Sequence, residues 1–256
     1  MPETPHESAE PAGFAAPAEA AAERRAELAA NLADVRKRIA AASAAAGRGT
    51  GEITLVAVTK TFPASDVRLL AGLGLTDVAE NRDQEAAPKA AATADLPLTW
   101  HFVGQLQSNK ARSVAGYADV VQSVDRPRLV TALSAAAVGL GRELRCLVQV
   151  SLDEPVPGGR ARGGVAPDRA AELAGAVAAA EGLVLDGVMA VAPLDADPGP
   201  AFERLAGVAA EIRSAHPGAA VISAGMSGDL EPAIACGATH LRIGTALLGG
   251  RRAIVR

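Results

Sequence analysis

Apolar and polar residues follow two different periods along this chain. Over residues 18–43 apolar side chains recur every three or four positions among charged ones, at Leu28, Leu32, Val35 and Ile39, which predicts an amphipathic helix. After this helix, short runs rich in β-branched residues alternate with longer alanine-rich stretches. This alternation is typical of repeated βα units around a parallel sheet.

The short runs predict eight strands and the stretches between them predict seven helices. The strands are expected at Ile53–Thr59, Thr76–Glu80, Thr99–Val103, Asp119–Val124, Leu144–Ser151, Val184–Ala190, Ala220–Ser223 and His240–Ile243. The helices are expected at Ala64–Leu73, Arg82–Ala92, Asn109–Ala115, Arg126–Val138, Pro167–Ala180, Ala201–Ala215 and Leu230–Cys236. The chain stops soon after the eighth strand, so we expect the N-terminal helix to cover the last gap, which would otherwise expose apolar surface.

Eight parallel strands can close into a barrel or remain an open, doubly wound sheet. No G-x-G-x-x-G motif follows the first strand, and eight βα units is the number of a TIM barrel, so the sequence favours an α/β fold of the (β/α)8 type. A chain of 256 residues fits one such domain, predicted over residues 18–256. Residues 1–17 are rich in Ala, Pro and Glu and are expected to form a disordered tail.

Composition excludes several classes of function. The net charge is −4 and aromatic residues make up 2% of the chain, which argues against nucleic-acid binding. Cys146 and Cys236 lack the spacing of a disulfide framework or a metal site. No signal peptide and no run of about 18 apolar residues is present. We therefore expect a cytoplasmic protein with no metal and no membrane contact, and we expect a monomer.

Lys60 is the sharpest candidate for chemistry. The carboxyl ends of barrel strands meet at one mouth, and Lys60 directly follows the first strand there. Strand alternation places Val56, Val58 and Lys60 on one face, so valines that fill the barrel would direct the amine into the mouth. Burial lowers the pKa of a lysine, as an imine-forming amine requires. The alternative is a strand-end lysine that extends into solvent.

The loops after the last two strands suggest a phosphate site. Pro232 is tolerated only in the first turn of its helix, so the amides around Ser227 are free to point into the mouth. Gly244 allows close backbone approach and Thr245 adds a donor. Barrel enzymes commonly bind phosphate at these two loops. Taken singly, a helix cap at Ser227 and a glycine at a tight turn are the simpler explanations.

Other strand-end residues are weaker candidates. Arg242 shares its strand face with Gly244 and needs a partner inside the barrel, either a ring nitrogen of a ligand or a carboxylate such as Glu80. A lone histidine on a strand, such as His101, is more often a packed core residue than a catalyst. An asparagine at a strand end, such as Asn81, commonly stabilises a turn. Residues 153–164, with their Pro and Gly, indicate either a mobile loop on the ligand face or a plain connector.

Several linked segments, in the same order, closely resemble the pyridoxal 5′-phosphate (PLP) homeostasis proteins, also called proline synthase co-transcribed homologues. The segments are Leu55–Lys60, Glu80–Asn81 with Gln84–Glu85, Trp100–Lys110, Gly187–Met189, Gly225–Ser227 and Arg242–Ala246. The resemblance covers residues 51–250. Departures are Ala79 and Ala224, where the family usually has Gly and Met, and a loop over residues 157–164 that lacks the family's lysine.

The resemblance implies a fold-type III PLP barrel, like the N-terminal domain of alanine racemase. It implies that Lys60 holds PLP as a Schiff base and that Arg242 faces the pyridine nitrogen. It also implies a cofactor site formed by Lys60, Asn81, His101, Met189, Ser223, Gly225, Met226, Ser227, Arg242, Gly244 and Thr245. Family members are thought to store, buffer or deliver PLP without established turnover, with apo forms of PLP enzymes as prospective partners.

Two enzymatic alternatives remain. A racemase on this barrel needs a second acid or base opposite the lysine, usually a tyrosine, and the single Tyr117 falls just before the fourth strand, at the opposite end from Lys60. His101 could replace it. An arginine beside the pyridine nitrogen would also weaken the ring as an electron sink. A PLP-free Schiff-base aldolase acting on a phosphosugar would likewise use a lysine and a phosphate site.

Overall fold

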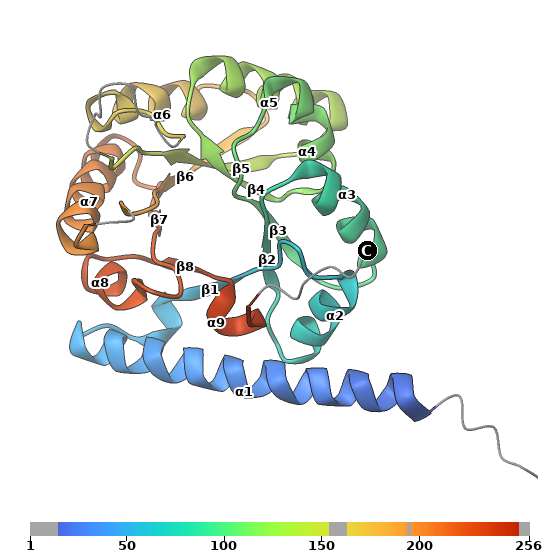
Figure 1. The fold of residues 1–256 in the computed structure, drawn as a ribbon. Coiled ribbons are helices and arrows are strands. Elements are labelled where there is room, and N and C mark those ends of the chain that lie inside the picture. The colour runs from blue at the N-terminus through green and yellow to red at the C-terminus, as the bar shows by residue number, and fades with distance from the viewer. Residues whose placement is uncertain (1–14, 154–162, 194–195, 251–256) are drawn as a thin grey trace, which may run out of the picture.

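A computed structural model describes residues 15–153, 163–193 and 196–250. Within them, eight parallel strands form a closed barrel in chain order, and the last strand pairs with the first (Figure 1). The strands are β1 (Thr54–Val58), β2 (Asp77–Glu80), β3 (Thr99–Phe102), β4 (Val120–Val124), β5 (Leu144–Gln149), β6 (Leu183–Met189), β7 (Val221–Ser223) and β8 (His240–Ile243). The prediction of a (β/α)8 barrel is confirmed.

Helices surround the barrel. They are α1 (Ala15–Ala45), α2 (Ala64–Gly72), α3 (Asp83–Ala92), α4 (Ala111–Tyr117), α5 (Pro127–Leu140), α6 (Ala170–Ala178), α7 (Pro198–Ala215), α8 (Leu230–Ala235) and α9 (Thr245–Leu248). Short 3-10 turns lie at Thr50–Glu52, Ser108–Lys110 and Pro167–Arg169. Most buried apolar side chains lie in one core between the sheet and the helices, and a small second cluster of Val120, Leu147 and Met189 lies apart from it.

The described elements depart from the predictions in several places. Helix α7 begins at Pro198 rather than Ala201, because the Asp197 carboxylate accepts a hydrogen bond from the Gly199 amide and proline suits the first helical position. A short helix, α9, follows β8, where none was predicted. Helix α1 begins at Ala15, so residues 15–17 are helical and not part of a tail. The rest of the predicted tail, residues 1–14, lies outside the described residues.

Helix α1 lies across the seam where β1 meets β8, alongside α8, α9 and α2 (Figure 1). Its predicted apolar stripe is buried, with exposed fractions of 0–6% from Leu28 to Ile39. The Arg24 guanidinium pairs with Asp66 of α2 at 2.7 Å, and the Asn31 amide donates to the Leu247 carbonyl of α9. The expectation that the N-terminal helix covers the last gap is therefore confirmed, with α9 sharing the cover.

Candidate functional site at the carboxyl end of the barrel

Lys60 is the second residue after β1, which ends at Val58 and not at Thr59 as predicted, and Lys60 is exposed. Leu55 and Ala57 pack in the outer core, so Val56 and Val58 face the barrel interior. The Thr59 hydroxyl donates to Glu80 on the helix side of the sheet. The alternation predicted from sequence thus continues to the end of the strand.

Lys60 differs from the other lysines of the chain. Lys89 is buried and its ammonium pairs with Glu80, and Lys110 pairs with Asp83 at 3.5 Å. Lys37 is exposed on α1, away from the strand ends. Within the described residues the Lys60 amine has no hydrogen-bond or ion-pair partner. Lys60 is therefore the lysine at the mouth whose amine is available to a ligand.

The turn that carries Lys60 is strained. The Phe62 amide donates to the Thr59 carbonyl at 3.1 Å, so Lys60 and Thr61 are the two central residues of a tight turn. Thr61 has φ = 69°, and it is the one non-glycine residue with positive φ among those described. A β-branched residue is unfavourable in this left-handed region, and such strain gathers at functional sites.

Arg242, predicted to face the barrel interior, does so. Its guanidinium donates to the Ser223 hydroxyl and to the Ala190 carbonyl, each at 2.7 Å. Burial lowers its pKa to about 10, so it stays charged at neutral pH. The alternative of an ion pair with Glu80 is wrong, because Glu80 lies on the helix side with Lys89. Neutral groups therefore hold this buried cation in the described part of the chain.

A chain of hydrogen bonds continues from Arg242 across the barrel. The Ser223 hydroxyl donates to Oε1 of the Gln122 side chain at 2.7 Å. Nε2 of the same side chain lies 2.8 Å from Nδ1 of His101. Nε2 of His101 lies 3.0 Å from Asp77 Oδ1. Because the Gln122 amide must donate, His101 accepts at Nδ1 and donates from Nε2. We call Asp77, His101, Gln122, Ser223 and Arg242 the interior chain.

The interior chain crosses the inside of the barrel, because β4 and β7, which carry Gln122 and Ser223, are not neighbours in the sheet. His101 and Ser223 were predicted to contact a cofactor. In the structure both ring nitrogens of His101 and the Ser223 hydroxyl are engaged with other side chains. Their contacts support Arg242, and direct contact of either residue with a ligand stays a prediction.

The loops after β7 and β8 come together as predicted. The Ala246 amide donates to the Ser227 hydroxyl at 3.1 Å, joining the two loops. The amides of Ser227, Gly244 and Thr245 form no hydrogen bond with another described residue. The Ser227 carbonyl accepts a hydrogen bond from Arg38 of α1. Free amides converging beside a hydroxyl form a ready anion site.

Gly225 permits the tight course of the first of these loops. Its φ is +90°, and a side-chain carbon there would lie 2.7 Å from the Ala233 methyl group and 2.9 Å from Leu241. Its carbonyl accepts from the Arg242 amide, which ties the loop to β8. Met226 is half-buried and its amide donates to Asp229. Gly225 is therefore required by backbone geometry and packing.

Neighbouring strand ends bring most predicted residues to one mouth. Asn81 follows β2, Lys60 follows β1 and Gly244 follows β8, and these three strands are adjacent in the barrel. Gly104, after β3, lies so close to the Asn81 backbone that a side-chain carbon there would be 2.0 Å from the Asn81 carbonyl oxygen. Met189 is different: it is 2% exposed and packs in the small apolar cluster.

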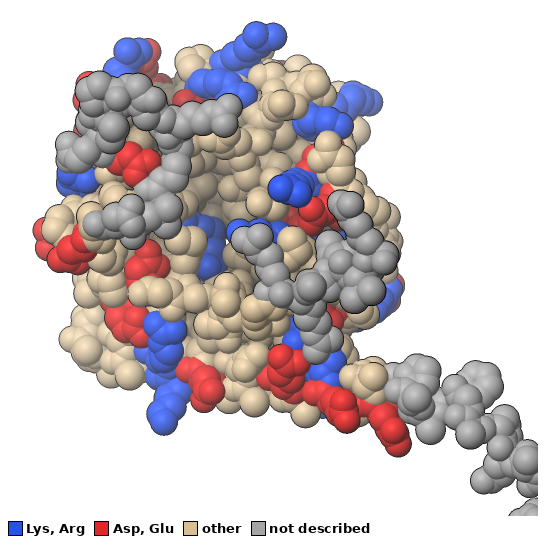
Figure 2. All heavy atoms as spheres, in the orientation of Figure 1, with Lys and Arg blue, Asp and Glu red and all other residues tan. Residues whose placement is uncertain are grey.

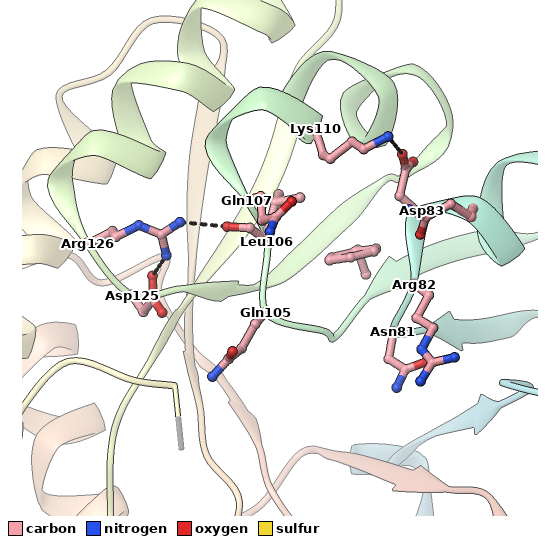
Figure 3. Close-up of a pocket in the computed structure, with 11 residues that line it drawn as sticks. Asn81, Arg82, Asp83, Gln105, Leu106, Gln107, Lys110, Asp125 and Arg126 are labelled. Carbon is pink, nitrogen blue, oxygen red and sulfur yellow. Dashed lines mark hydrogen bonds and ion pairs between the residues drawn. The ribbon is translucent and has the colours of Figure 1, made fainter. Parts of the chain in front are cut away.

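A pocket of about 470 Å³ opens beside the mouth and includes Asn81 in its lining. Figure 3 shows Lys110 directed toward Asp83 and Arg126 toward Asp125, so these charges are paired within the lining. In the orientation of Figure 1, the space-filling view is hollowed at the centre, and Lys or Arg side chains are visible inside the hollow (Figure 2).

Sequence reasoning missed several residues of the site. Gln122 joins the two halves of the interior chain, Asp77 ends it, and the Ala190 carbonyl holds the arginine. None of them has a local sequence signal. The predicted loop over residues 153–164 lies largely outside the described residues. No helix in the described ranges is long and apolar enough to cross a membrane, and no cluster of His, Cys, Asp and Glu there is placed to hold a metal.

Residues 24–252 match the family model of the alanine racemase N-terminal domain. Alanine racemase from Corynebacterium glutamicum has a similar fold, with a TM-score of 0.66 at 15% identity, over 91% of this chain and 62% of that one. The class is therefore a barrel of the alanine racemase N-terminal type.

Closer relatives define the family. The chain is 46% identical to the pyridoxal phosphate homeostasis protein of Mycobacterium tuberculosis H37Rv, over 90% of this chain and 95% of the relative. It is 43% identical to that of Pseudomonas aeruginosa, over 88% and 96%. PipY of Synechococcus elongatus, solved with PLP bound, is 33% identical with a TM-score of 0.74, over 87% of this chain and 100% of PipY. The chain belongs to the pyridoxal phosphate homeostasis protein family.

Proposed function

We propose that this protein binds PLP as a Schiff base on Lys60 and stores, buffers or delivers it to apo forms of PLP enzymes in the cytoplasm. The observation that carries the proposal is the position of Lys60. It is an unpaired amine at the end of β1, on the strand adjacent to β8, whose loop joins that of β7 to present free amides.

The residues at the mouth fit the cofactor's chemistry. PLP has an aldehyde, a phosphate and a pyridine nitrogen, and each would meet a suitable group. Lys60 supplies the amine, and the amides of Ser227, Gly244 and Thr245 supply unbonded donors for phosphate oxygens. Arg242 is a buried cation with neutral partners, so a pyridine lone pair would be a favourable further acceptor.

When bound, PLP would supply an aldehyde for imine formation and an aromatic ring for electron withdrawal. The chain's own residues limit the second property. Arg242 stays protonated at neutral pH, so it would donate to the pyridine nitrogen and would disfavour protonation of that nitrogen. An unprotonated ring is a poor electron sink. The interior chain fixes Arg242 in this role, which suits holding a cofactor more than using it.

The racemase alternative is not favoured by the position of Tyr117. Its ring packs edge-on against Trp100 with centroids 6.5 Å apart, in the core between the sheet and the helices. Burial raises the pKa of its hydroxyl. A tyrosine outside the barrel cannot meet a ring held inside the mouth. His101, the other candidate base, has both ring nitrogens engaged in the interior chain.

Reduction with borohydride after addition of PLP, followed by peptide mapping, tests the proposal. We expect label on Lys60 in the wild-type protein, none in Lys60→Ala, and unchanged label in Lys110→Ala. Pyridoxal, which lacks the phosphate, should bind more weakly than PLP if the amides of the two loops hold that group. Label on another lysine, or rapid racemisation of added amino acids, would contradict the proposal.

A further inference from the structure

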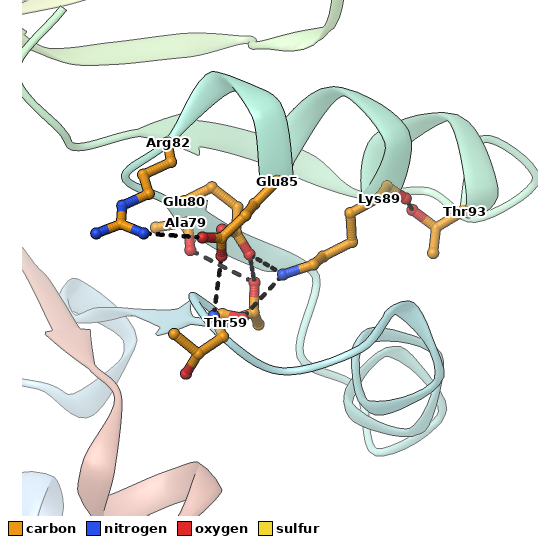
Figure 4. Close-up of polar contacts among 8 residues, drawn as sticks. Thr59, Ala79, Glu80, Arg82, Glu85, Lys89 and Thr93 are labelled. Carbon is orange, nitrogen blue, oxygen red and sulfur yellow. Dashed lines mark hydrogen bonds and ion pairs between the residues drawn. The ribbon is translucent and has the colours of Figure 1, made fainter. Parts of the chain in front are cut away.

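A buried ionic cluster lies directly beneath the turn that carries Lys60. The Lys89 ammonium of α3 pairs with Oε1 of Glu80 and donates to the Thr59 carbonyl at 2.9 Å (Figure 4). The Thr59 hydroxyl donates to the same Glu80 oxygen at 2.6 Å. We call Thr59, Glu80 and Lys89 the outer cluster, because it lies between the sheet and α3.

The members of this cluster are removed from water. Glu80 is 0% exposed, Thr59 is 0% exposed and Lys89 is 8% exposed. Burial raises the pKa of Glu80, against the opposing effect of Lys89 and Thr59. The second carboxylate oxygen, Oε2, is buried and has no hydrogen-bond partner among the described residues. A cluster of this kind is not an efficient source of stability, since apolar residues of similar volume often replace buried ion pairs without loss.

The contacts of the cluster converge on the peptide groups around Lys60. The Thr59 carbonyl, which precedes Lys60, accepts from both Lys89 and the Phe62 amide. On the other side, the Thr61 amide donates to Oε2 of Glu85, one turn before Lys89 on α3. The backbone is thus held on both sides of Lys60 by an ammonium and a carboxylate group of α3, and Glu80 of β2 binds that ammonium group.

The strained backbone of Thr61 explains why these hydrogen bonds matter. A non-glycine residue at φ = 69° persists only when its surroundings fix it. The hydrogen bonds on either side of Thr61 are the contacts that fix it here. Without them the turn would relax toward an ordinary conformation and would redirect the side chain of Lys60.

We propose that Lys89 and Glu80 are positioning residues, whose ion pair holds the turn at residues 59–62 so that the Lys60 amine points into the mouth. This inference rests on the proposed function, because it assigns the pair a role in forming the Schiff base on Lys60. It gives Lys89 no covalent role of its own, since its ammonium is buried between two acceptors.

The test replaces the pair without leaving a buried charge. We expect Glu80→Gln/Lys89→Met to fold and to bind PLP covalently about tenfold more weakly, equivalent to about 1.4 kcal/mol. The measurement is a PLP titration followed by absorption of the Schiff base, with borohydride labelling of Lys60 at fixed PLP. Val177→Ala is the control, because it removes buried volume from α6 and lowers the melting temperature without touching the turn.

A second variant separates positioning from general stability. Glycine adopts positive φ without strain, so adding Thr61→Gly to the double variant should restore most of the labelling of Lys60. Wild-type PLP affinity in Glu80→Gln/Lys89→Met, or an equal loss of affinity in Val177→Ala, would overturn the inference and leave the proposed function intact. Absence of Lys60 label in the wild-type protein would instead overturn the proposed function.

Discussion

Two buried polar groups of residues lie on opposite sides of the same sheet and differ in kind. The interior chain crosses the barrel through neutral side chains, with charges only at its ends, Asp77 and Arg242. The outer cluster is a close ion pair, Glu80 with Lys89, on the helix side. The first supports the arginine expected to meet the pyridine ring, and the second supports the backbone of Lys60.

The difference shows how one barrel can support two residues of the proposed site, Arg242 and Lys60, by separate means. Each hydrogen bond in the interior chain has a defined direction, so removal of one member leaves its neighbours unpaired. The outer cluster depends instead on attraction between opposite charges in a dry site, and loss of either charge leaves the other uncompensated. The two should therefore respond differently to mutation and to pH.

The largest expected effect is on the outer cluster. Lys89→Ala leaves the buried Glu80 carboxylate without its cation and should lower the free energy of unfolding by about 3–5 kcal/mol. Urea denaturation measures the change. Replacing both partners, in Glu80→Leu/Lys89→Met, should restore most of that stability, because the uncompensated charge is gone. A loss below about 1 kcal/mol in Lys89→Ala would show that the pair is not desolvated as described.

The second effect is a pH dependence that arises from His240 in the barrel interior. Burial and the neighbouring His101 lower the pKa of His240 to about 4, while Asp77 opposes this and Arg145 and Arg242 add to it. The folded form keeps His240 neutral, whereas the unfolded form is protonated below about pH 6.5. Stability is thus full above pH 6.5 and falls as pH drops toward 4, by up to about 3 kcal/mol.

Urea denaturation at several pH values tests this dependence. We expect His240→Asn to flatten the profile between pH 6.5 and 4. His216→Asn, at the end of α7, serves as the matched control and should leave the profile as it is. An unchanged slope in His240→Asn would refute the assignment.

A third, smaller effect isolates the interior chain. Gln122→Leu removes the acceptor of the Ser223 hydroxyl and the donor to Nδ1 of His101, and should lower the free energy of unfolding by about 1–3 kcal/mol. It should also change the absorption spectrum of bound PLP, since Arg242 would lose its alignment. Ser123→Ala is the control on the same strand, because that hydroxyl is buried without a partner. Equal effects of the two variants would contradict the role of Gln122.

The smallest effect concerns the exposed ion pair beside the outer cluster, between Arg82 and Glu85. Arg82 lies 3.5 Å from Glu85, and its side chain is 70% exposed. Exposed pairs of this kind contribute about 0–1 kcal/mol, so Arg82→Ala should change stability by less than that and leave Lys60 labelling intact. Glu85→Ala, which removes the acceptor of the Thr61 amide, should reduce the labelling. If Arg82→Ala also reduces the labelling of Lys60, the exposed Arg82 side chain helps to hold the turn, contrary to this prediction.

The fold could be predicted because barrel strands carry short, strongly apolar runs between alanine-rich stretches, as at Leu55–Val58. Helix α9 was missed because it has only four residues, too few to show a period. The start of α7 was missed because its cap, Asp197, precedes a Pro-Gly-Pro run that resembles a loop. These are failures of short local signals and not of the overall pattern.

The site was predictable only where residues follow strands. Lys60, Asn81 and Gly244 carry that signal, and the structure places them on adjacent strands. Gln122 lies inside a strand, and its partners are 21 and 101 positions away, so no local pattern indicates it. Lys89 had a usable signal: Ala86, Ala90 and Thr93 share its face of α3, which marks that face as buried.

The long α1 helix also bears on how this protein reaches its folded state. Arg38 bonds to Glu231 and to the Ser227 carbonyl, partners 193 and 189 positions further along the chain. The ribosome makes this helix before the barrel strands, and its apolar stripe lacks its α8 and α9 neighbours until those helices have emerged. The nascent chain therefore exposes an apolar surface through most of barrel synthesis, and contacts so distant in sequence are expected to slow folding.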